Sequence, residues 1–273
     1  MTEQETQEPN GDFVQSLARG LEVLNFLGGA GGAVSATQVA EKTGLNRATA
    51  RRLLKTLEAV GYVRQIGREY VLSSKNLELG YHYLANLGIS DLVAHPIERL
   101  SAALGEAVSV SIRDGLEILY VARARPARVM TVSLGVGARL PVWHTSMGRV
   151  LLSALADPEV ASLIDHAQPL EKRTANTIVT TAEIVAEIST VRNQGWSMVD
   201  QELEWGLRSL AVPLRRDGQI VAALNVASAN VGEEPLVTQG RILPGLIETS
   251  HQIDVILSQV PNGALSLNGA NGQ

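Results

Sequence analysis

Two groups of side chains have the types and the spacing that binding chemistry requires. The first group gathers cations, amides and hydroxyls between residues 35 and 68. Arginine can hydrogen-bond guanine through two donors and asparagine can read adenine, each for about 1–3 kcal/mol of discrimination. The residues expected to contact base edges are Asn46, Arg47, Thr49 and Arg51. Contacts to phosphate fix register without reading sequence, and those expected here come from Ser35, Thr37, Gln38, Arg52 and Lys55, with Arg64 and Arg68 flanking them.

The distribution of charge favours a nucleic-acid partner for this part of the chain. The whole sequence carries a formal net charge of −5. Residues 11–75 hold nine basic and five acidic residues, a net charge of +4, so the remainder carries −9. A basic module on an acidic body is typical of a DNA reader with a separate regulatory domain. The alternative is a solvated basic helix in a small helical domain that binds another protein.

The second group lies at Thr145-Ser146-Met147-Gly148, where hydroxyls stand at the start of a predicted helix. Backbone N–H groups at a helix N-terminus attract anions, and pockets for organic ligands combine a few such groups with apolar walls. Met147 and Leu140 are expected to supply flexible apolar walls, against which an aromatic ring of a ligand can pack. Ser146 has an alternative role as the N-cap of the helix, which competes for the same donors.

Two pairs of charged residues have a spacing of two, which places each pair on one face of a strand. Arg123 and Arg125 are able to bind a ligand carboxylate or, alternatively, to form surface salt bridges. Asp200 and Glu202 resemble paired catalytic acids, but no partner base or metal is in view. We therefore interpret these two acids as structural.

The sequence predicts no catalytic centre, metal or cofactor. His144, Ser146 and Asp200 suggest a hydrolase, but no GxSxG motif surrounds the serine. The five histidines lack metal-ligand spacing, and cysteine is absent, which excludes disulfides, thiolate catalysis and cysteine-bound zinc. No run of 18 apolar residues and no apolar signal segment at residues 1–10 is present, so we expect a cytoplasmic protein.

The elements that position the first group follow the order of a winged helix-turn-helix. Leucines at helical spacing predict a helix over 16–27. A second helix begins after Ser35, which with Gln38 forms a capping box, and ends at Gly44. Asn46 caps a third helix, whose cations lie off its apolar stripe and which ends at Gly61. Strands over 62–66 and 69–73 then form a hairpin.

The pattern of elements in the rest of the chain predicts an α+β domain around a mixed or antiparallel sheet. An amphipathic linker helix is predicted over 76–88, and the winged helix-turn-helix domain over 13–75. The effector-binding and oligomerisation domain then covers 89–260, between terminal tails at 1–12 and 261–273 that we expect to be disordered. The helices predicted within it are 90–104, 146–156, 158–167, 181–193 and 236–260, and the strands are 107–112, 117–122, 129–134, 196–199, 209–215 and 219–227.

Long ordered segments of the chain resemble the IclR family of bacterial transcriptional regulators from about Phe13 to Val260. They include SLARGLEVLNFL, TGLNRATARRLLKTLEAVGYV, LELGYHYL, GARLPVWHTSMGRVLLSAL and VDQELEWGLRSLAVPLRRDGQIVAALNVA. The resemblance implies a GAF-like effector domain, and dimers that often pair into tetramers on a double-stranded DNA operator. Transferred by position, the effector site contains Thr145, Ser146, Met147, Gly148, Asp200, Glu202, Ser209, Asn225 and Ala227, to which we add Met130, Leu140 and His144.

Within the family, YVARARPARVMTVSLGVGARLP, TSMGRVLL and VDQELEWGLRS resemble the Pca, Pob and Cat regulators of the β-ketoadipate pathway. This implies an effector that is a small organic acid, either aromatic or dicarboxylic. Relatives that bind small oxoacids carry hydroxyl residues where this chain has Asn225 and Ala227, which disfavours glyoxylate or pyruvate. The alternative function is an enzyme that acts on a small carboxylic acid and is recruited to nucleic acid by its basic domain.

Overall fold

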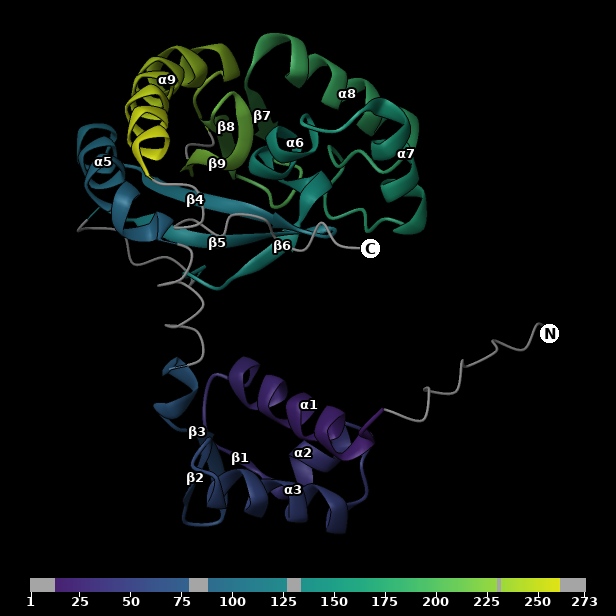
Figure 1. Cartoon of the computed structure of the whole chain (residues 1–273). Coiled ribbons are helices and arrows are strands. Elements are labelled where there is room, and N and C mark those ends of the chain that lie inside the picture. The colour runs from purple at the N-terminus through teal and green to yellow at the C-terminus, as the bar shows by residue number, and fades with distance from the viewer. Residues whose placement is uncertain (1–12, 79–87, 127–133, 230–231, 261–273) are drawn as a thin grey trace, which may run out of the picture. The chain divides into compact units, whose positions relative to one another are not determined.

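The computed structural model describes residues 13–78, 88–126, 134–229 and 232–260. Contacts between residues divide the chain into two compact units, Met1–His82 and Tyr83–Gln273 (Figure 1). Both predicted tails lie outside the described residues, as do all but the last residue of the strand predicted over 129–134 and most of the predicted linker helix. Residues 75–78, at the start of the predicted linker, are helical.

Besides the helical residues 75–78, the described part of the first unit contains α1 (Gln15–Gly29), α2 (Ala36–Lys42), α3 (Arg47–Ala59) and a small antiparallel sheet. Its strands are β1 (Val34–Ser35), β2 (Val63–Ile66) and β3 (Glu69–Leu72), in the order β1-β3-β2. The sequence analysis did not predict β1, a two-residue strand too short for a periodicity signal. The core is formed by buried side chains of all three helices and the sheet, among them Val23, Val39, Leu54, Val63 and Tyr70.

Side-chain caps fix where α2 and α3 begin. The Ser35 hydroxyl accepts from the Gln38 N–H and the Gln38 side chain accepts from the Ser35 N–H, so the predicted capping box is present. The Asn46 side chain accepts from the Thr49 N–H at 2.8 Å. Each cap satisfies backbone donors that the first turn of a helix leaves free. The first turns of both helices are therefore fixed by side-chain caps.

The second unit is built on one six-stranded sheet, in the order β6-β5-β4-β9-β8-β7, with every neighbouring pair antiparallel. The strands are β4 (Ala107–Asp114), β5 (Glu117–Ala124), β6 (Arg139–Pro141), β7 (Ser197–Asp200), β8 (Arg208–Arg216) and β9 (Gln219–Ser228). The α+β fold class is confirmed. β6 was not predicted, because three residues that include a proline give no alternating pattern.

Helices cover both faces of this sheet (Figure 1). α5 (Ile89–Leu104) and α9 (Pro235–Gln259) pack on one face and share its apolar core. On the other face lie the short helix η1 (Val142–His144) and α6 (Ser146–Leu152), followed by α7 (Asp157–His166) and α8 (Thr181–Gln194). Strand side chains alternate between the two cores, as in Ala211 against α6 and Leu210 against α9. A sheet covered in this way fixes the register of its strands.

A buried ion pair joins α6 to the loop between β7 and β8. Arg149 is 2% exposed, and its Nη2 donates to Glu202 Oε2 at 2.7 Å. The Arg149 Nε also donates to the Trp143 carbonyl at 3.2 Å, and the Ile178 N–H donates to Glu202. The Thr177 hydroxyl donates to the Glu202 carbonyl at 2.7 Å. The loop is thus held in place by charge and by hydrogen bonds that water does not reach.

Loss of the Glu202 charge should destabilise the second unit strongly. Glu202→Gln leaves the buried Arg149 guanidinium without its close counter-ion, at a cost of about 3–5 kcal/mol. Glu187→Gln is the matched control, since Glu187 lies 3.6 Å from Arg149 and its side chain is one-third exposed. Its cost should not exceed about 1 kcal/mol. Urea unfolding followed by tryptophan fluorescence measures both, because Trp143, Trp196 and Trp205 all belong to this unit. Equal losses in the two variants would contradict the structural role of the pair.

Candidate functional site

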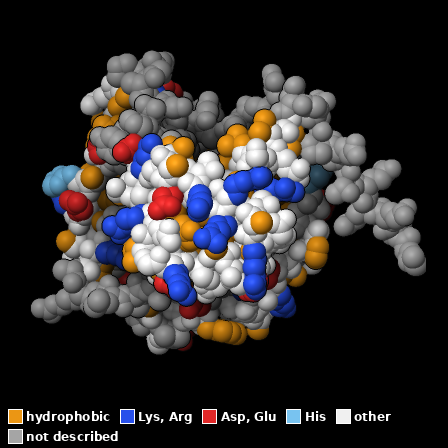
Figure 2. Space-filling model, turned by 90° about the horizontal axis from the view of Figure 1, so that it is seen from below, with side chains coloured by type: hydrophobic (Ala, Val, Ile, Leu, Met, Phe, Trp, Pro, Cys, Tyr) orange, Lys and Arg blue, Asp and Glu red, His pale blue; other side chains and the backbone are white. Residues whose placement is uncertain are grey.

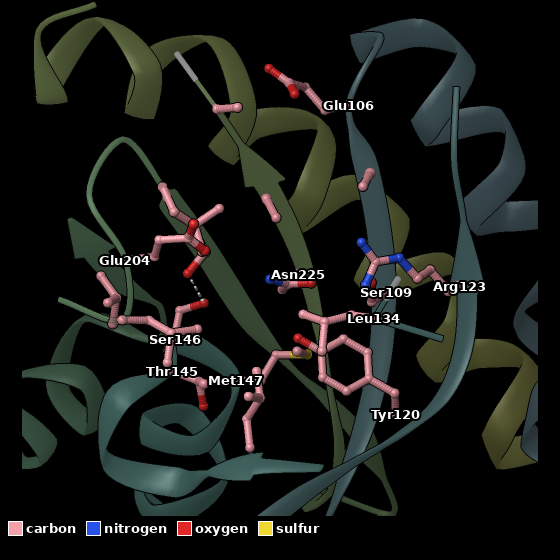
Figure 3. Close-up of a pocket in the computed structure, with 18 of the residues that line it drawn as sticks. Glu106, Ser109, Tyr120, Arg123, Leu134, Thr145, Ser146, Met147, Glu204 and Asn225 are labelled. Carbon is pink, nitrogen blue, oxygen red and sulfur yellow. Dashed lines mark hydrogen bonds between the residues drawn. The ribbon is translucent and has the colours of Figure 1, made fainter. Parts of the chain in front are cut away.

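The second unit contains a cavity of about 380 Å³ over the sheet face that carries α6. Strands β4, β5, β8 and β9 supply its floor, and the start of α6 and the 201–207 loop supply its walls (Figure 3). The lining mixes apolar side chains with a small number of polar ones, a composition typical of small-molecule sites. Its size is also in the range of such sites.

Eight of the predicted effector-site residues lie together in the lining of this cavity. They come from separate parts of the sequence, and the fold brings them to one place: Leu140, His144, Thr145, Ser146, Met147, Ser209, Asn225 and Ala227. In Figure 3, Ser146 and Thr145 lie on one side, Asn225 lies in the middle and Met147 lies below it. The segment at the start of α6 is therefore a wall of the cavity.

The structure does not bring three other predicted residues to the cavity, and Met130 lies outside the described residues. Gly148 is buried against η1, and a Cβ added there would overlap the Val142 backbone. Its small size therefore serves close packing. Asp200 accepts from Arg208 Nε at 2.8 Å, and Glu202 pairs with Arg149. The carboxylates of both acids are used in ion pairs, so expected contacts of these three residues with an effector are corrected here to packing and structural roles.

The cap of α6 differs from the expected one. Thr145, not Ser146, is the N-cap, and its hydroxyl accepts from the Gly148 N–H at 3.0 Å. The Ser146 hydroxyl donates instead to the Ser209 hydroxyl at 2.9 Å, across the wall of the cavity. Neither Ser146 nor Asp200 contacts His144, since their side chains bond Ser209 and Arg208. The arrangement is not a catalytic triad.

His144 is uncharged at neutral pH. Burial is the largest cause that lowers its pKa to about 4, and the charge of Arg173 lowers it further. Glu171 opposes this decrease through its charge and its backbone, although neither ring nitrogen completes a hydrogen bond of normal geometry with a described residue. His144 therefore adds no charge to the cavity near pH 7.

Several lining residues were missed, because they belong to strands that the sequence analysis treated as framework. They include Glu106, Ser109 and Tyr120, together with Leu134 and the 203–207 loop around Trp205. Arg123 and Arg125 were singled out by their spacing, and both line the cavity. Neither forms an ion pair with a described residue, so the expected surface salt bridges are absent from that part of the chain. The sequence did contain one signal for Ser109, since serines alternate with valines in β4 and polar residues in a buried strand indicate a polar lining.

The first unit presents cations on α3 and on the β2–β3 hairpin. Figure 2 shows blue side chains spread over this face with few red ones among them. The exposed cations are Arg47, Arg51, Arg52, Lys55, Arg64 and Arg68. Within the described ranges 13–78 and 88–126, none of the six forms an ion pair. Unpaired exposed cations leave the surface free to bind phosphate.

The polar side chains near these cations are partly used by the helix caps. Gln38 Oε1 accepts from both the N–H and the hydroxyl of Ser35, at 2.8 and 2.9 Å. Asn46 Oδ1 accepts from Thr49. Thr37 is half-buried in the first turn of α2. The amide N–H groups of Gln38 and Asn46 remain as donors toward a bound molecule.

No helix in the described part of the chain is long and apolar enough to cross a membrane. Among those same residues, no group of three or more histidine and acidic side chains is placed to hold a metal ion.

Comparisons with known proteins agree with this architecture. A family model described as the IclR helix-turn-helix domain matches residues 16–67, and one described as the bacterial transcriptional regulator IclR C-terminal domain matches residues 81–255. The chain is 41% identical to the Pca regulon regulatory protein of Pseudomonas putida, over 89% of this chain and 84% of that protein. It is 32% identical to the p-hydroxybenzoate hydroxylase transcriptional activator of Acinetobacter baylyi, over 89% and 91% of the two chains.

The fold is also that of an IclR homologue from Microbacterium hydrocarbonoxydans, solved in complex with 4-hydroxybenzoate. The TM-score is 0.77 at 21% identity, covering 90% of this chain and all of that one. The relatives are named as regulators of transcription, and both domain models match in the expected order. The chain therefore belongs to the IclR family of bacterial transcriptional regulators, with the helix-turn-helix domain in its first unit and the IclR C-terminal domain in its second.

Proposed function

We propose that this regulator binds a specific DNA operator through α3 and the wing, and that a small aromatic acid of the β-ketoadipate pathway modulates its activity. The observation that carries the proposal is a 380 Å³ cavity with mixed polar and apolar walls, in a chain 41% identical to a Pca regulon regulatory protein. The cavity gives the regulator a place for an effector. The relatives supply the class of pathway.

The DNA surface follows from the geometry of α2 and α3. In a helix-turn-helix, the second helix of the motif enters the major groove with its N-terminal residues on base edges. Arg47 and Arg51 lie one turn apart at the start of α3, and both are exposed. Arg52 and Lys55 follow on the same helix, and Arg64 and the turn residue Arg68 belong to the wing. We infer that the first two arginines read bases and that the other cations bind phosphate.

The aromatic effector is supported by the walls of the cavity and by two of the similar proteins. Leu134, Leu140 and Met147 are apolar, and Tyr120 supplies a ring. One relative is an activator named for p-hydroxybenzoate hydroxylase, and one protein of the same fold binds 4-hydroxybenzoate. An effector changes DNA binding only by the difference between its affinities for the two states of the protein. We propose that this difference reaches the DNA-binding unit through the segment near residues 76–88, in a dimer or a dimer of dimers on a pseudo-palindromic operator.

Two substitutions on α3 should weaken DNA binding in different ways. Arg47→Ala should lose about 1–3 kcal/mol of preference for the operator over unrelated DNA, because base contacts carry discrimination. Lys55→Ala should weaken both kinds of DNA alike and reduce the slope of log affinity against log salt by about one. Fluorescence anisotropy with labelled duplexes at several salt concentrations measures both effects.

The matched control for these variants is Arg19→Ala, which removes one exposed cation from α1 in the same unit. It should change neither discrimination nor the salt slope appreciably. Equal operator affinity in the wild type and in both α3 variants would contradict the assigned surface.

A ligand panel tests the effector class on the full-length protein. The compounds are protocatechuate, 4-hydroxybenzoate, cis,cis-muconate, β-ketoadipate, pyruvate and glyoxylate. A ligand at 100 times its Kd stabilises the native state by about 2.7 kcal/mol, which a thermal shift detects readily. We expect stabilisation by an aromatic acid and none by pyruvate or glyoxylate. A response to the two oxoacids alone would overturn the aromatic assignment and leave the DNA-binding prediction unaffected.

A further inference from the structure

Strand register places three polar side chains in one row across the floor of the cavity. Ser109 of β4 pairs with Arg123 of β5 on one side and with Asn225 of β9 on the other. Directly opposed residues of antiparallel strands point to the same face of the sheet. Neighbouring strands lie about 4.8 Å apart, so the row spans roughly 10 Å between its outer backbones. Figure 3 shows the Arg123 side chain extending over Ser109 toward Asn225.

The next row along the sheet is different in character. Ala227 of β9 pairs with Ala107 and with Ser209, and these three residues also line the cavity. Small side chains at this level leave space above the floor. Ser209, at one end of this row, accepts from Ser146, which Figure 3 shows on the side of the cavity opposite Arg123. The cavity therefore has a cationic end, small residues in the middle of its floor and a hydroxyl end.

A β-bulge explains why Tyr120 shares the face of Arg123. Residues three apart on a regular strand point to opposite faces. In β5, Ala122 pairs with Val110 and Tyr120 pairs with Ser111, which leaves Val121 as the extra residue. A bulge of this kind redirects the side chains that follow it. The Arg123 guanidinium lies 5.8 Å from the centre of the Tyr120 ring, so the bulge builds an aromatic wall beside the cation.

Neither end of the polar row has a counter-ion or a hydrogen-bond partner among the described residues. The buried Arg123 Nε has no hydrogen-bond acceptor, and the Arg123 side chain forms no ion pair there. Asn225 is 4% exposed, and its buried Oδ1 has no donor. Burial is the largest cause that lowers the pKa of Arg123, so the half-buried guanidinium has lost part of its hydration. Unpaired buried polar groups cost stability, and such groups point to a ligand when they face a cavity.

The other charged groups at the cavity are already used or exposed. Glu106 accepts from Ser228 and from Arg241, so its carboxylate is occupied. Arg125 donates to the Leu134 carbonyl, and both Arg125 and Glu204 are exposed to solvent, which screens their charges. His144 is neutral. Among the residues the structure describes, the interior of the cavity therefore carries one uncompensated positive charge.

We propose that Arg123 binds the carboxylate of the effector and that the Asn225 carbonyl accepts a hydrogen bond from a hydroxyl on the same molecule. The ligand is then a monocarboxylate that bears a hydroxyl group, and a dicarboxylate fits less well. This inference rests on the proposed function. It moves the anion site from the start of α6, where Thr145 already caps the helix, to the β5 edge of the floor. The apolar walls hold the body of the ligand between the two polar contacts.

Calorimetry on full-length protein with 4-hydroxybenzoate tests the carboxylate contact. Arg123→Gln should weaken binding by about 10- to 100-fold, the range for a hydrogen bond to a charged group. Arg99→Gln is the matched control, which makes the same charge change at an exposed residue of α5 outside the cavity lining, and it should weaken binding by less than about threefold. The neutral probe 4-hydroxybenzamide should bind the wild type weakly and should not distinguish Arg123→Gln from it. Unchanged affinity of Arg123→Gln for 4-hydroxybenzoate would overturn the inference while the proposed function stood.

Benzoate and Asn225→Leu test the second contact. Wild-type protein should bind benzoate more weakly than 4-hydroxybenzoate, and Asn225→Leu should remove most of that preference. If the wild type binds only cis,cis-muconate or β-ketoadipate, and Arg123→Gln abolishes that binding, the aromatic proposal fails and the role of Arg123 as carboxylate ligand stands. A preference for 4-hydroxybenzoate that survives in Asn225→Leu would refute the hydroxyl contact.

Stability without ligand gives a readout that does not depend on the choice of probe. A cation kept unpaired for a ligand destabilises the empty protein. Arg123→Met keeps much of the side-chain volume without the charge, so its melting temperature should exceed that of the wild type. A lower melting temperature would mean that Arg123 supports the fold, and the inference would then be wrong.

Discussion

The strand register of β5, β4 and β9 is the constraint on which the cavity and its polar row depend. A slip of one residue in either pairing would move Arg123 or Asn225 to the opposite face, into the core beneath α5 and α9. The valines and leucines of that face in β4 and β9 oppose the slip, because Val108, Val110, Leu224 and Val226 would each be exchanged for a polar or small side chain. Residues that never contact the cavity therefore hold its polar row in line.

The ion pair of Arg149 and Glu202 likewise fixes the position of cavity walls, those formed by α6 and by the 201–207 loop. Arg149 belongs to α6, whose first turn is one wall, and Glu202 belongs to the loop that carries Trp205, which is another. The two walls are therefore fixed to each other below the cavity, while Trp205 remains 61% exposed at its mouth. A firm base with an open mouth suits a site that must admit a ligand and then respond to it.

Most of the fold could be predicted from the sequence, since periodicity and caps are local signals. The capping box at Ser35 and Gln38 and the cap at Asn46 are present as expected. The α1 leucines illustrate the limit of such signals. Their spacing gave the helix correctly, yet Leu17 and Leu21 are more than half exposed, and Val23 and Leu27 form the buried face. Periodicity predicts a helix more securely than it predicts which stripe faces inward.

The site was less accessible to sequence reasoning, because pairing between distant strands creates it. Ser109 and Asn225 lie more than a hundred residues apart and become neighbours only through the β4–β9 register. No sequence pattern indicates the bulge at Val121, so we did not predict that Tyr120 and Arg123 lie on the same face of the sheet. Asp200 and Glu202, chosen by position in a conspicuous motif, turned out to be bonded to arginines outside the cavity.

The caps of α2 and α3 have a consequence for the kind of sequence this protein can read. Gln38 and Asn46 turn their carbonyl oxygens toward their own helices, so they face a bound duplex chiefly with N–H groups. Arginine side chains likewise offer only donors. Adenine presents a donor beside an acceptor in the major groove, whereas guanine presents two acceptors. A surface made of donors favours guanine, so G·C pairs are the base pairs that these side chains are best suited to contact.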